Sequence, residues 1–389
     1  MPAKSSAASD NFVNFDSIQL TIDRAAFLRS LGRLQSIVEK RNTIPILSNI
    51  KIEAAGGNLN LTATDMDIAA TEKVAAKITK EGAVTVPAHT LYDIVRKLPE
   101  GSEIELSLDA AKGNQLKVKS GNSKFQLSCL PAADFPTISE GQLTHNFSLS
   151  KSEFISLIKK TRFSISTEET RYYLNGVYLH ISPGAENQSL RAVSTDGHRL
   201  ARIEVPVPAG AAGMPGVIIP RKTVVEVKKI AEEGGETIQV SLSKTKIKFD
   251  SGNITLVSKL IDGTFPDYER VIPKENNKIM EVDSRLLTQA VDRVSTIATE
   301  TRAIKFAMSG GKLTLSASSQ DNGDATEEIP ANYSSDAMDI GFNYRYVLEM
   351  MGELEGETAQ FVFSDSTSPA LVRDPADVTA LYVIMPMRV

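Results

Sequence analysis

The stretch Ser194-Thr195-Asp196-Gly197-His198-Arg199-Leu200-Ala201 carries the strongest local clue to the fold of this chain. The alternating run Leu190-Arg191-Ala192-Val193 precedes it and predicts a strand. Asp196-Gly197 then predicts a tight turn, because glycine adopts positive φ at no steric cost. His198, Arg199 and Leu200 leave this turn together and could form one wall of a pocket. A weaker echo, Thr62-Ala63-Thr64-Asp65, indicates an internal repeat.

Length and composition bound the class of protein. The 389 residues suffice for about two or three domains, and 41% hydrophobic with 23% charged residues are typical of a globular protein. No apolar run approaches the roughly 20 residues of a membrane span, and the N-terminus lacks the apolar core of a signal peptide. The single cysteine, Cys129, excludes an intramolecular disulfide and fits a reducing compartment. We therefore expect a cytoplasmic protein without membrane contact, whose residues 1–17 form a disordered N-terminal extension.

The net charge of -5 argues against a tight, sequence-reading nucleic-acid binder, which would carry a basic excess. Tryptophan is absent and 6% of residues are aromatic, so stacking platforms for bases are not expected. Net charge does not describe how charges are distributed, however. Any contact with nucleic acid should therefore be weak and directed at the backbone.

Apolar spacing and capping residues predict six helices. Asp23 is expected to cap the first, Pro87 and Pro220 to open the second and fourth, and Ser150 with Glu153 to form a capping box for the third. Alternating runs between them predict strands. The expected helices are 23–39, 89–98, 150–162, 220–230, 283–297 and 343–351. The expected strands are 18–22, 51–53, 58–62, 103–108, 115–120, 125–130, 147–149, 178–181, 190–193, 238–242, 246–249, 254–257, 312–316, 326–329, 361–363 and 380–384.

These elements repeat along the chain. Asp196, Pro220 and Pro266 each follow Asp65, Pro87 and Pro136 by roughly 130 residues, in the same order, and a third unit follows with more drift. Each unit combines two helices with hairpin-linked strands, which predicts three repeated α+β domains with helices covering one face of the sheets.

The repeat has a consequence for charge. The helices can bury their apolar faces and leave cations exposed, so an arc of three domains would place helices and cations inside and sheets with acidic residues outside. Two such chains meeting head to tail would close a ring. A basic bore would hold a polyanion by topology, in spite of the acidic total.

Several segments carry a resemblance to a known family. They are Arg41-Asn-Thr-Ile-Pro-Ile-Leu47, Leu130-Pro-Ala-Ala-Asp-Phe-Pro136, Arg171-Tyr-Tyr-Leu-Asn-Gly176, Thr195-Asp-Gly-His-Arg-Leu200, Phe265-Pro-Asp-Tyr268 followed by Val271-Ile-Pro273, and Tyr382-Val-Ile-Met-Pro-Met-Arg388. From about Ile18 to Val389 the chain resembles the bacterial DNA polymerase III beta subunit, the replicative sliding clamp.

The resemblance implies the DNA-clamp fold with domains at 18–142, 146–270 and 271–389. It implies a head-to-tail homodimeric ring around duplex DNA, bound without sequence preference, and no catalysis or cofactor. The implied partners are the DNA polymerase III alpha subunit, an ATP-dependent clamp loader, and other polymerases and repair proteins that carry a short hydrophobic peptide.

The resemblance also implies three sets of site residues. The peptide-binding cleft between the second and third domains would contain Arg171, Leu174, Thr195, Gly197, His198, Arg199, Leu200, Pro266, Val271, Val383, Met385, Met387 and Arg388. Adaptable methionines and the aliphatic stem of Arg199, with its charged tip at the edge, suit such a cleft. DNA contacts would come from Arg41, Arg221, Lys222 and Arg270, with Arg24 and Lys159 added from their helix positions. Phe125 and Ile297 would mark the subunit contact.

Other interpretations remain open on the residues alone. Met385 and Met387 could be ordinary core, and His198 a turn residue with local hydrogen bonds. Asp196 and His198 could act as an acid–base pair beside Ser194 or Thr195, although one tight turn does not assure their contact. The chain has no phosphate-loop, dinucleotide or metal motif. A monomeric peptide-binding scaffold that does not encircle DNA is the second alternative. Ser368-Pro369 departs from the family that the chain resembles, because a proline stands near the cleft where the family carries a small polar residue.

Overall fold

The computed structural model describes residues 17–109, 111, 113–183, 188–298 and 300–389. The disorder predicted for the N-terminal extension lies outside this part of the chain, apart from residue 17. The chain separates into two compact units, formed by residues up to 142 with 233–235 and 248–258, and by the remaining residues. No helix in the described ranges is both long and apolar enough to span a membrane.

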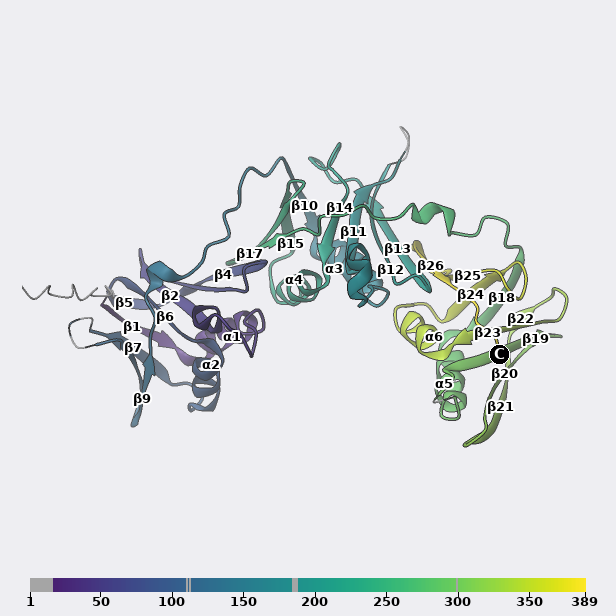
Figure 1. Ribbon diagram of the computed structural model, residues 1–389, viewed down its shortest axis with the longest axis horizontal. Coiled ribbons are helices and arrows are strands. Elements are labelled where there is room, and N and C mark those ends of the chain that lie inside the picture. Colours follow the sequence, from purple (N-terminus) through teal and green to yellow (C-terminus); the bar gives the residue numbers. More distant parts are fainter. Residues whose placement is uncertain (1–16, 110, 112, 184–187, 299) are drawn as a thin grey trace, which may run out of the picture. The chain divides into compact units, whose positions relative to one another are not determined.

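Among its described residues, the first unit contains the α-helices α1 and α2 and antiparallel strands in two sheets (Figure 1). One sheet has the order β5-β1-β7-β8-β9, and the other includes the run β17-β4-β3-β2-β6. Helices α1 and α2 pack against each other. The bounds are β1 Ile18–Asp23, α1 Arg24–Leu34, β2 Asn49–Ala55, β3 Asn58–Thr64, β4 Ile68–Ala75, β5 Lys77–Lys80, β6 Gly82–Pro87, α2 Ala88–Lys97, β7 Glu103–Leu108, β8 Gln115–Ser120, β9 Ser123–Ser128 and, partly in this unit, β16 Lys246–Ser251 and β17 Ile254–Lys259.

Within the described ranges, the second unit contains the α-helices α3, α4, α5 and α6 (Figure 1). Helix α3 packs on β11, β12 and β13, and α5 packs on α6 and on β18 to β21. The bounds are β10 His145–Ser150, α3 Lys151–Arg162, β11 Gly176–Ile181, β12 Ser189–Thr195, β13 Arg199–Pro206, β14 Val217–Pro220, α4 Arg221–Glu233, β15 Thr237–Leu242, β18 Lys278–Asp283, α5 Ser284–Ser295, β19 Ala303–Ser309, β20 Lys312–Ser319, β21 Gly323–Pro330, β22 Asn332–Tyr333, β23 Met338–Asn343, α6 Tyr344–Met351, β24 Thr358–Phe363, β25 Ala370–Asp374 and β26 Asp377–Ile384.

The first and third helices start at their predicted caps, whereas the first helix ends earlier than predicted. The Asp23 carboxylate accepts a hydrogen bond from the amide of Ala26, and Ser150 forms the predicted capping box with Glu153. The first helix ends at Leu34 rather than at residue 39. Ile37 and Val38 are buried, as is typical of apolar residues, but they lie in a turn that follows the helix. Pro87 precedes α2 as its N-cap instead of occupying the first helical position.

One continuous sheet crosses the middle of the second unit. Its order is β14-β11-β12-β13-β26-β25-β24-β18-β22, so β13 and β26 are neighbours although they are far apart in sequence. Leu200 pairs with Val383 and Arg199 with Ile384 in this antiparallel ladder. The backbone hydrogen bonds of β13 and β26 therefore join the part of the chain before residue 259 to the C-terminal part.

The predicted echo of the Asp196 turn is confirmed in atomic detail. In the first unit, Asp65 Oδ1 accepts from the amides of Asp67 and Ile68. In the second, Asp196 Oδ1 accepts from the amides of His198 and Arg199. The residue after each aspartate has positive φ, +90° at Gly197 and +77° at Met66. The two turns thus share one hydrogen-bond pattern but place different residues in the left-handed position.

Candidate functional site

An apolar cleft opens at the junction of β13 and β26. Its volume is about 300 Å³. Leu200 and Val383 are ladder neighbours, and both belong to a buried apolar cluster with Leu174 and Tyr268. Ten residues predicted for the cleft line it, namely Arg171, Leu174, Thr195, Gly197, Arg199, Leu200, Pro266, Val271, Val383 and Met385.

The mouth of the cleft combines accessible apolar side chains with charges. Val271 is 50% exposed and Met385 40% exposed. Arg171 and Asp267 both line the cavity, and Arg171 Nε donates to Glu168 at 2.8 Å. An apolar anchor would be desolvated inside, while a ligand's polar groups would meet opposite charges at the mouth.

Two features require glycine at position 197, its backbone conformation and the close approach of the Arg171 side chain. Its φ of +90° disfavours any L side chain. A Cβ atom at this position would lie 2.6 Å from Nη1 of Arg171. The turn therefore lets the Arg171 side chain cross directly over the backbone at the cleft wall.

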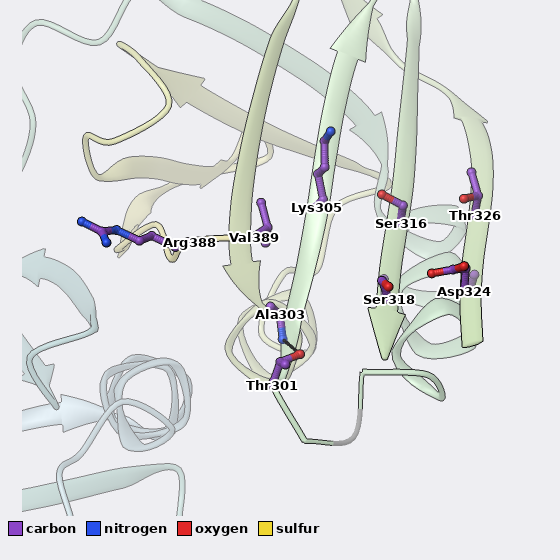
Figure 2. Close-up of a pocket in the computed structure, with 11 residues that line it drawn as sticks. Thr301, Ala303, Lys305, Ser316, Ser318, Asp324, Thr326, Arg388 and Val389 are labelled. Carbon is purple, nitrogen blue, oxygen red and sulfur yellow. Dashed lines mark hydrogen bonds between the residues drawn. The ribbon is translucent and has the colours of Figure 1, made fainter. Parts of the chain in front are cut away.

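Three predicted cleft residues do not line this cavity. His198 is exposed, and its ring lies 6.2 Å from that of Tyr346. The Met387 amide donates to the carbonyl of Gly341, which directs the chain after Pro386 toward β23. Arg388 instead borders a separate hollow of about 470 Å³ on the face of β19 to β21. In Figure 2 the guanidinium of Arg388 points away from these strands. Val389 lies close to Gly341 on β23.

The tip of Arg199 also differs from the prediction. Only 7% of its side chain is exposed, and the guanidinium contacts Asp196, Glu349 and the carbonyl of Phe163. It also lies 4.3 Å from the centroid of the Tyr346 ring. The charged tip is therefore not free at the cleft edge, because it joins the β12–β13 turn to α6.

Three further residues line the cleft that the sequence did not single out, Tyr173, Asp267 and Tyr268. Each lies inside a segment that carried the resemblance, so proximity to the predicted residues was the available signal. Tyr268 is 5% exposed, and its role as a wall depends on the fold of the segment between β17 and β18.

The arrangement does not favour the acid–base alternative. Asp196 uses one oxygen for backbone amides and the other for Nε of Arg199. The hydroxyl of Ser194 is buried and donates to the carbonyl of Thr161. The aspartate and the serine are thus both committed to structural hydrogen bonds.

The cations predicted to contact DNA fall into different environments. Arg24 is 9% exposed, and its guanidinium donates to the carbonyls of Val95 at 3.1 Å and Arg96 at 2.6 Å. It therefore holds α1 against the end of α2, and we withdraw it as a DNA contact. Arg41, Arg221 and Arg270 are exposed, and Lys222 is half-buried.

Helix α3 shows that cations on helices are not all free. Lys159 lies 3.7 Å from Glu355 and 4.0 Å from Glu353. Lys160 is buried and pairs with Asp377 at 2.5 Å. The expectation that helices leave their cations exposed is wrong for Lys160, as for Arg24.

The two residues predicted at a subunit contact are partly accessible. Phe125 is 37% exposed on β9, the terminal strand of its sheet. Ile297 is half-buried and follows the end of α5 rather than lying on it.

Repeated α+β units and an apolar cleft with a charged mouth define a multidomain binding protein. Family models for the N-terminal, central and C-terminal domains of the DNA polymerase III beta subunit match residues 18–139, 148–267 and 269–388. The chain belongs to the DNA polymerase III beta subunit family, and it is a sliding clamp that acts in DNA replication as a processivity subunit.

Relatives and solved structures agree along nearly the whole length. The beta sliding clamp of Caulobacter vibrioides is 49% identical over 374 residues, which cover 96% of this chain and 100% of the relative. The beta sliding clamp of Escherichia coli is 37% identical, with 95% and 100% covered. Solved clamps of Caulobacter crescentus and of Bartonella birtlesii, the latter bound to griselimycin, each superpose with a TM-score of 0.93 at 48% identity and cover 96% of this chain and 100% of theirs.

Proposed function

We propose that this clamp tethers its partners through the cleft over β13 and β26. The observation that carries the proposal is the convergence of ten predicted residues on one apolar cavity. A partner would insert aliphatic or aromatic side chains of a short peptide, and Met385 at the mouth can adapt to different anchors. The proposed users are the DNA polymerase III alpha subunit, an ATP-dependent clamp loader, and other polymerases and repair proteins.

Two exposed valines give a matched test of the cleft. Val271 lies at the mouth, whereas Val378 is 90% exposed on β26 and does not line the cavity. The probe is griselimycin, which is bound in the solved clamps of Bartonella birtlesii and Pseudomonas aeruginosa. Titration calorimetry should show binding to the unmodified chain, a loss of about tenfold or more for Val271→Lys, and no change for Val378→Lys. Equal effects of the two substitutions would contradict the cleft assignment.

We also propose that two copies form a head-to-tail ring around duplex DNA. Two terminal strands suit such a contact, because an unpaired strand edge can pair with another chain. Strand β9 carries Lys124 and Phe125. Strand β21 carries Asp324, Glu327 and Glu328, of which Glu327 pairs with Arg293 and Glu328 with Lys312. Ile297 follows α5 in the same C-terminal third of the chain as β21, and we propose that it lies near this contact.

The ring would hold DNA through phosphate contacts. Arg41, Arg221, Lys222 and Arg270 are the proposed contacts, with Lys159 in a secondary role because of Glu353 and Glu355. Such contacts carry no sequence information and weaken as salt rises. For this ring we propose domains at 18–142, 146–270 and 271–389.

Retention on DNA tests the ring directly. The chain is loaded on a nicked circular plasmid with a clamp loader and ATP, and retention is measured at high salt before and after the plasmid is linearised. A topological link predicts retention on the circle and loss from the linear form. Equal retention that collapses with salt on both forms would instead support the monomeric scaffold.

A further inference from the structure

One wall of the cleft belongs to the segment between β17 and β18, residues 260–277, here called the connecting segment. Its residues Pro266, Asp267, Tyr268 and Val271 all line the cavity. This wall contains no strand, and its regular structure is the short 3₁₀ turn Tyr268–Arg270. Backbone hydrogen bonds fix the connecting segment at Ile261 and Asn277, so side-chain contacts must hold the wall between these two residues.

The face of β11 to β13 beneath the connecting segment changes from apolar to polar. Near the cleft it presents Val193 and Leu200, which belong to the buried cluster around Tyr268. Farther along the same strands, His180 pairs in register with Arg191, and Arg191 with Glu204. The connecting segment is thus held by an apolar cluster and by a neighbouring polar cluster.

Tyr268 belongs to both clusters. Nδ1 of His180 lies 2.8 Å from the carbonyl of Ile181, so this nitrogen carries the proton and Nε2 is the acceptor. The Tyr268 hydroxyl lies 3.0 Å from Nε2 and donates to it. Arg191 Nη1 donates to the same hydroxyl at 3.3 Å and to Glu269 at 2.5 Å. Aromatic packing adds to this arrangement, because the Tyr178 ring stacks on His180 and on Phe265.

We propose that His180 and Arg191 are positioning residues for the peptide cleft, which fix Tyr268 and so keep its wall formed before a partner binds. The proposal rests on the function proposed above for the same cleft. Neither residue lines the cavity, so neither would touch the ligand. They act on the fraction of molecules whose cleft is ready to bind, and that fraction scales the apparent affinity.

The rate constants distinguish positioning from contact. A variant that lowers the competent fraction slows association and leaves dissociation unchanged, whereas loss of a ligand contact mainly speeds dissociation. With griselimycin as the probe in surface plasmon resonance, His180→Leu should slow association about three- to tenfold, the range expected for loss of one buried hydrogen bond. Tyr268→Phe should act in the same way, and the double variant should add little to either.

Rescue and pH supply the second readout. His180→Gln keeps an uncharged acceptor close to the position of Nε2 and should restore the association rate. Burial lowers the pKa of His180, with Arg191 and Arg202 opposing its charge and Glu269 favouring it. The other titratable groups in contact with it are Tyr268 and Tyr178, and Glu204 pairs with Arg191. Protonation removes the acceptor, so association with the unmodified chain should be constant at neutral pH and fall below the ordinary histidine pKa of about 6.5. His180→Gln should not show this fall.

His145→Leu on β10 is the matched control, because this histidine lies in the same unit and contacts Thr144 rather than the connecting segment. Thermal unfolding identifies any variant that fails to fold, in which case Tyr268→Phe carries the test. Unchanged association in folded His180→Leu and Tyr268→Phe would overturn the positioning role and leave the cleft assignment intact. Failure of griselimycin to bind the unmodified chain would instead overturn the proposed function.

Discussion

The two aspartate turns allow a reciprocal experiment on backbone strain. They share their hydrogen bonds, but the left-handed position holds Gly197 in one and Met66 in the other. Relative to glycine, a residue with a side chain loses about 1–2 kcal/mol of folding stability in this conformation. It regains about 0.4–1 kcal/mol, because its unfolded chain has less conformational entropy to lose. The net cost of a side chain is therefore about 1 kcal/mol, which corresponds to about 2–4 °C in a unit of this size.

Met66→Gly should accordingly raise the melting temperature of its unit by about 2–4 °C. Gly197→Ala should lower the melting temperature of the other unit by at least as much. The new Cβ atom would lie 2.6 Å from Nη1 of Arg171 and would therefore also push this side chain aside. Arg171 lines the cleft, so Gly197→Ala should weaken griselimycin binding as well, whereas Met66→Gly should not. Differential scanning calorimetry measures both changes. Equal signs for the two substitutions, or no change in either, would refute the strain argument.

Arg24→Met should cost about 2–4 kcal/mol of unfolding free energy, because it leaves the carbonyls of Val95 and Arg96 without their buried donor. Exposed Arg41→Met should stay within about 0.5 kcal/mol in the same urea titration but shorten retention on circular DNA; the reverse pattern would contradict both assignments. Burial raises the pKa of Glu353, so its charge opposes folding at neutral pH. Glu353→Gln should raise the melting temperature at pH 7 by about 2–4 °C, with the difference shrinking as pH falls and the native carboxylate takes up its proton; a lower melting temperature would show that the neighbouring lysines outweigh burial. Burial raises the pKa of Cys129 to about 11, so this thiol should react with Ellman's reagent only after unfolding, and fast reaction of the native chain would disprove its burial.

Local signals predicted the starts of helices well, since a cap needs only neighbours in sequence. Asp23 and the Ser150–Glu153 pair illustrate this. Helix ends and several strands could not be predicted in the same way. Ile37 and Val38 continue an apolar pattern, yet they fill the core from a turn. Strand β25 was not predicted, and it lies between β24 and β26 in the sheet.

The cleft was predictable where the chain follows its strands and not where long-range contacts redirect it. Thr195 and Leu200 lie on a hairpin that the sequence already defined. Met387 lies outside the cleft because its amide donates a hydrogen bond to the carbonyl of Gly341. Arg24 is buried because its guanidinium donates hydrogen bonds to two carbonyls about 70 residues away in sequence. Such partners become visible only after the tertiary fold is known.

The ladder between β13 and β26 also sets the mechanical path through the molecule. A partner anchored over Leu200 and Val383, as proposed above, would pull on two adjacent strands at once. Their hydrogen bonds lie across the strands, so a pull along the strands loads the whole ladder in shear instead of opening it one bond at a time. Tension from a moving polymerase would therefore be shared between the central and C-terminal parts of the clamp.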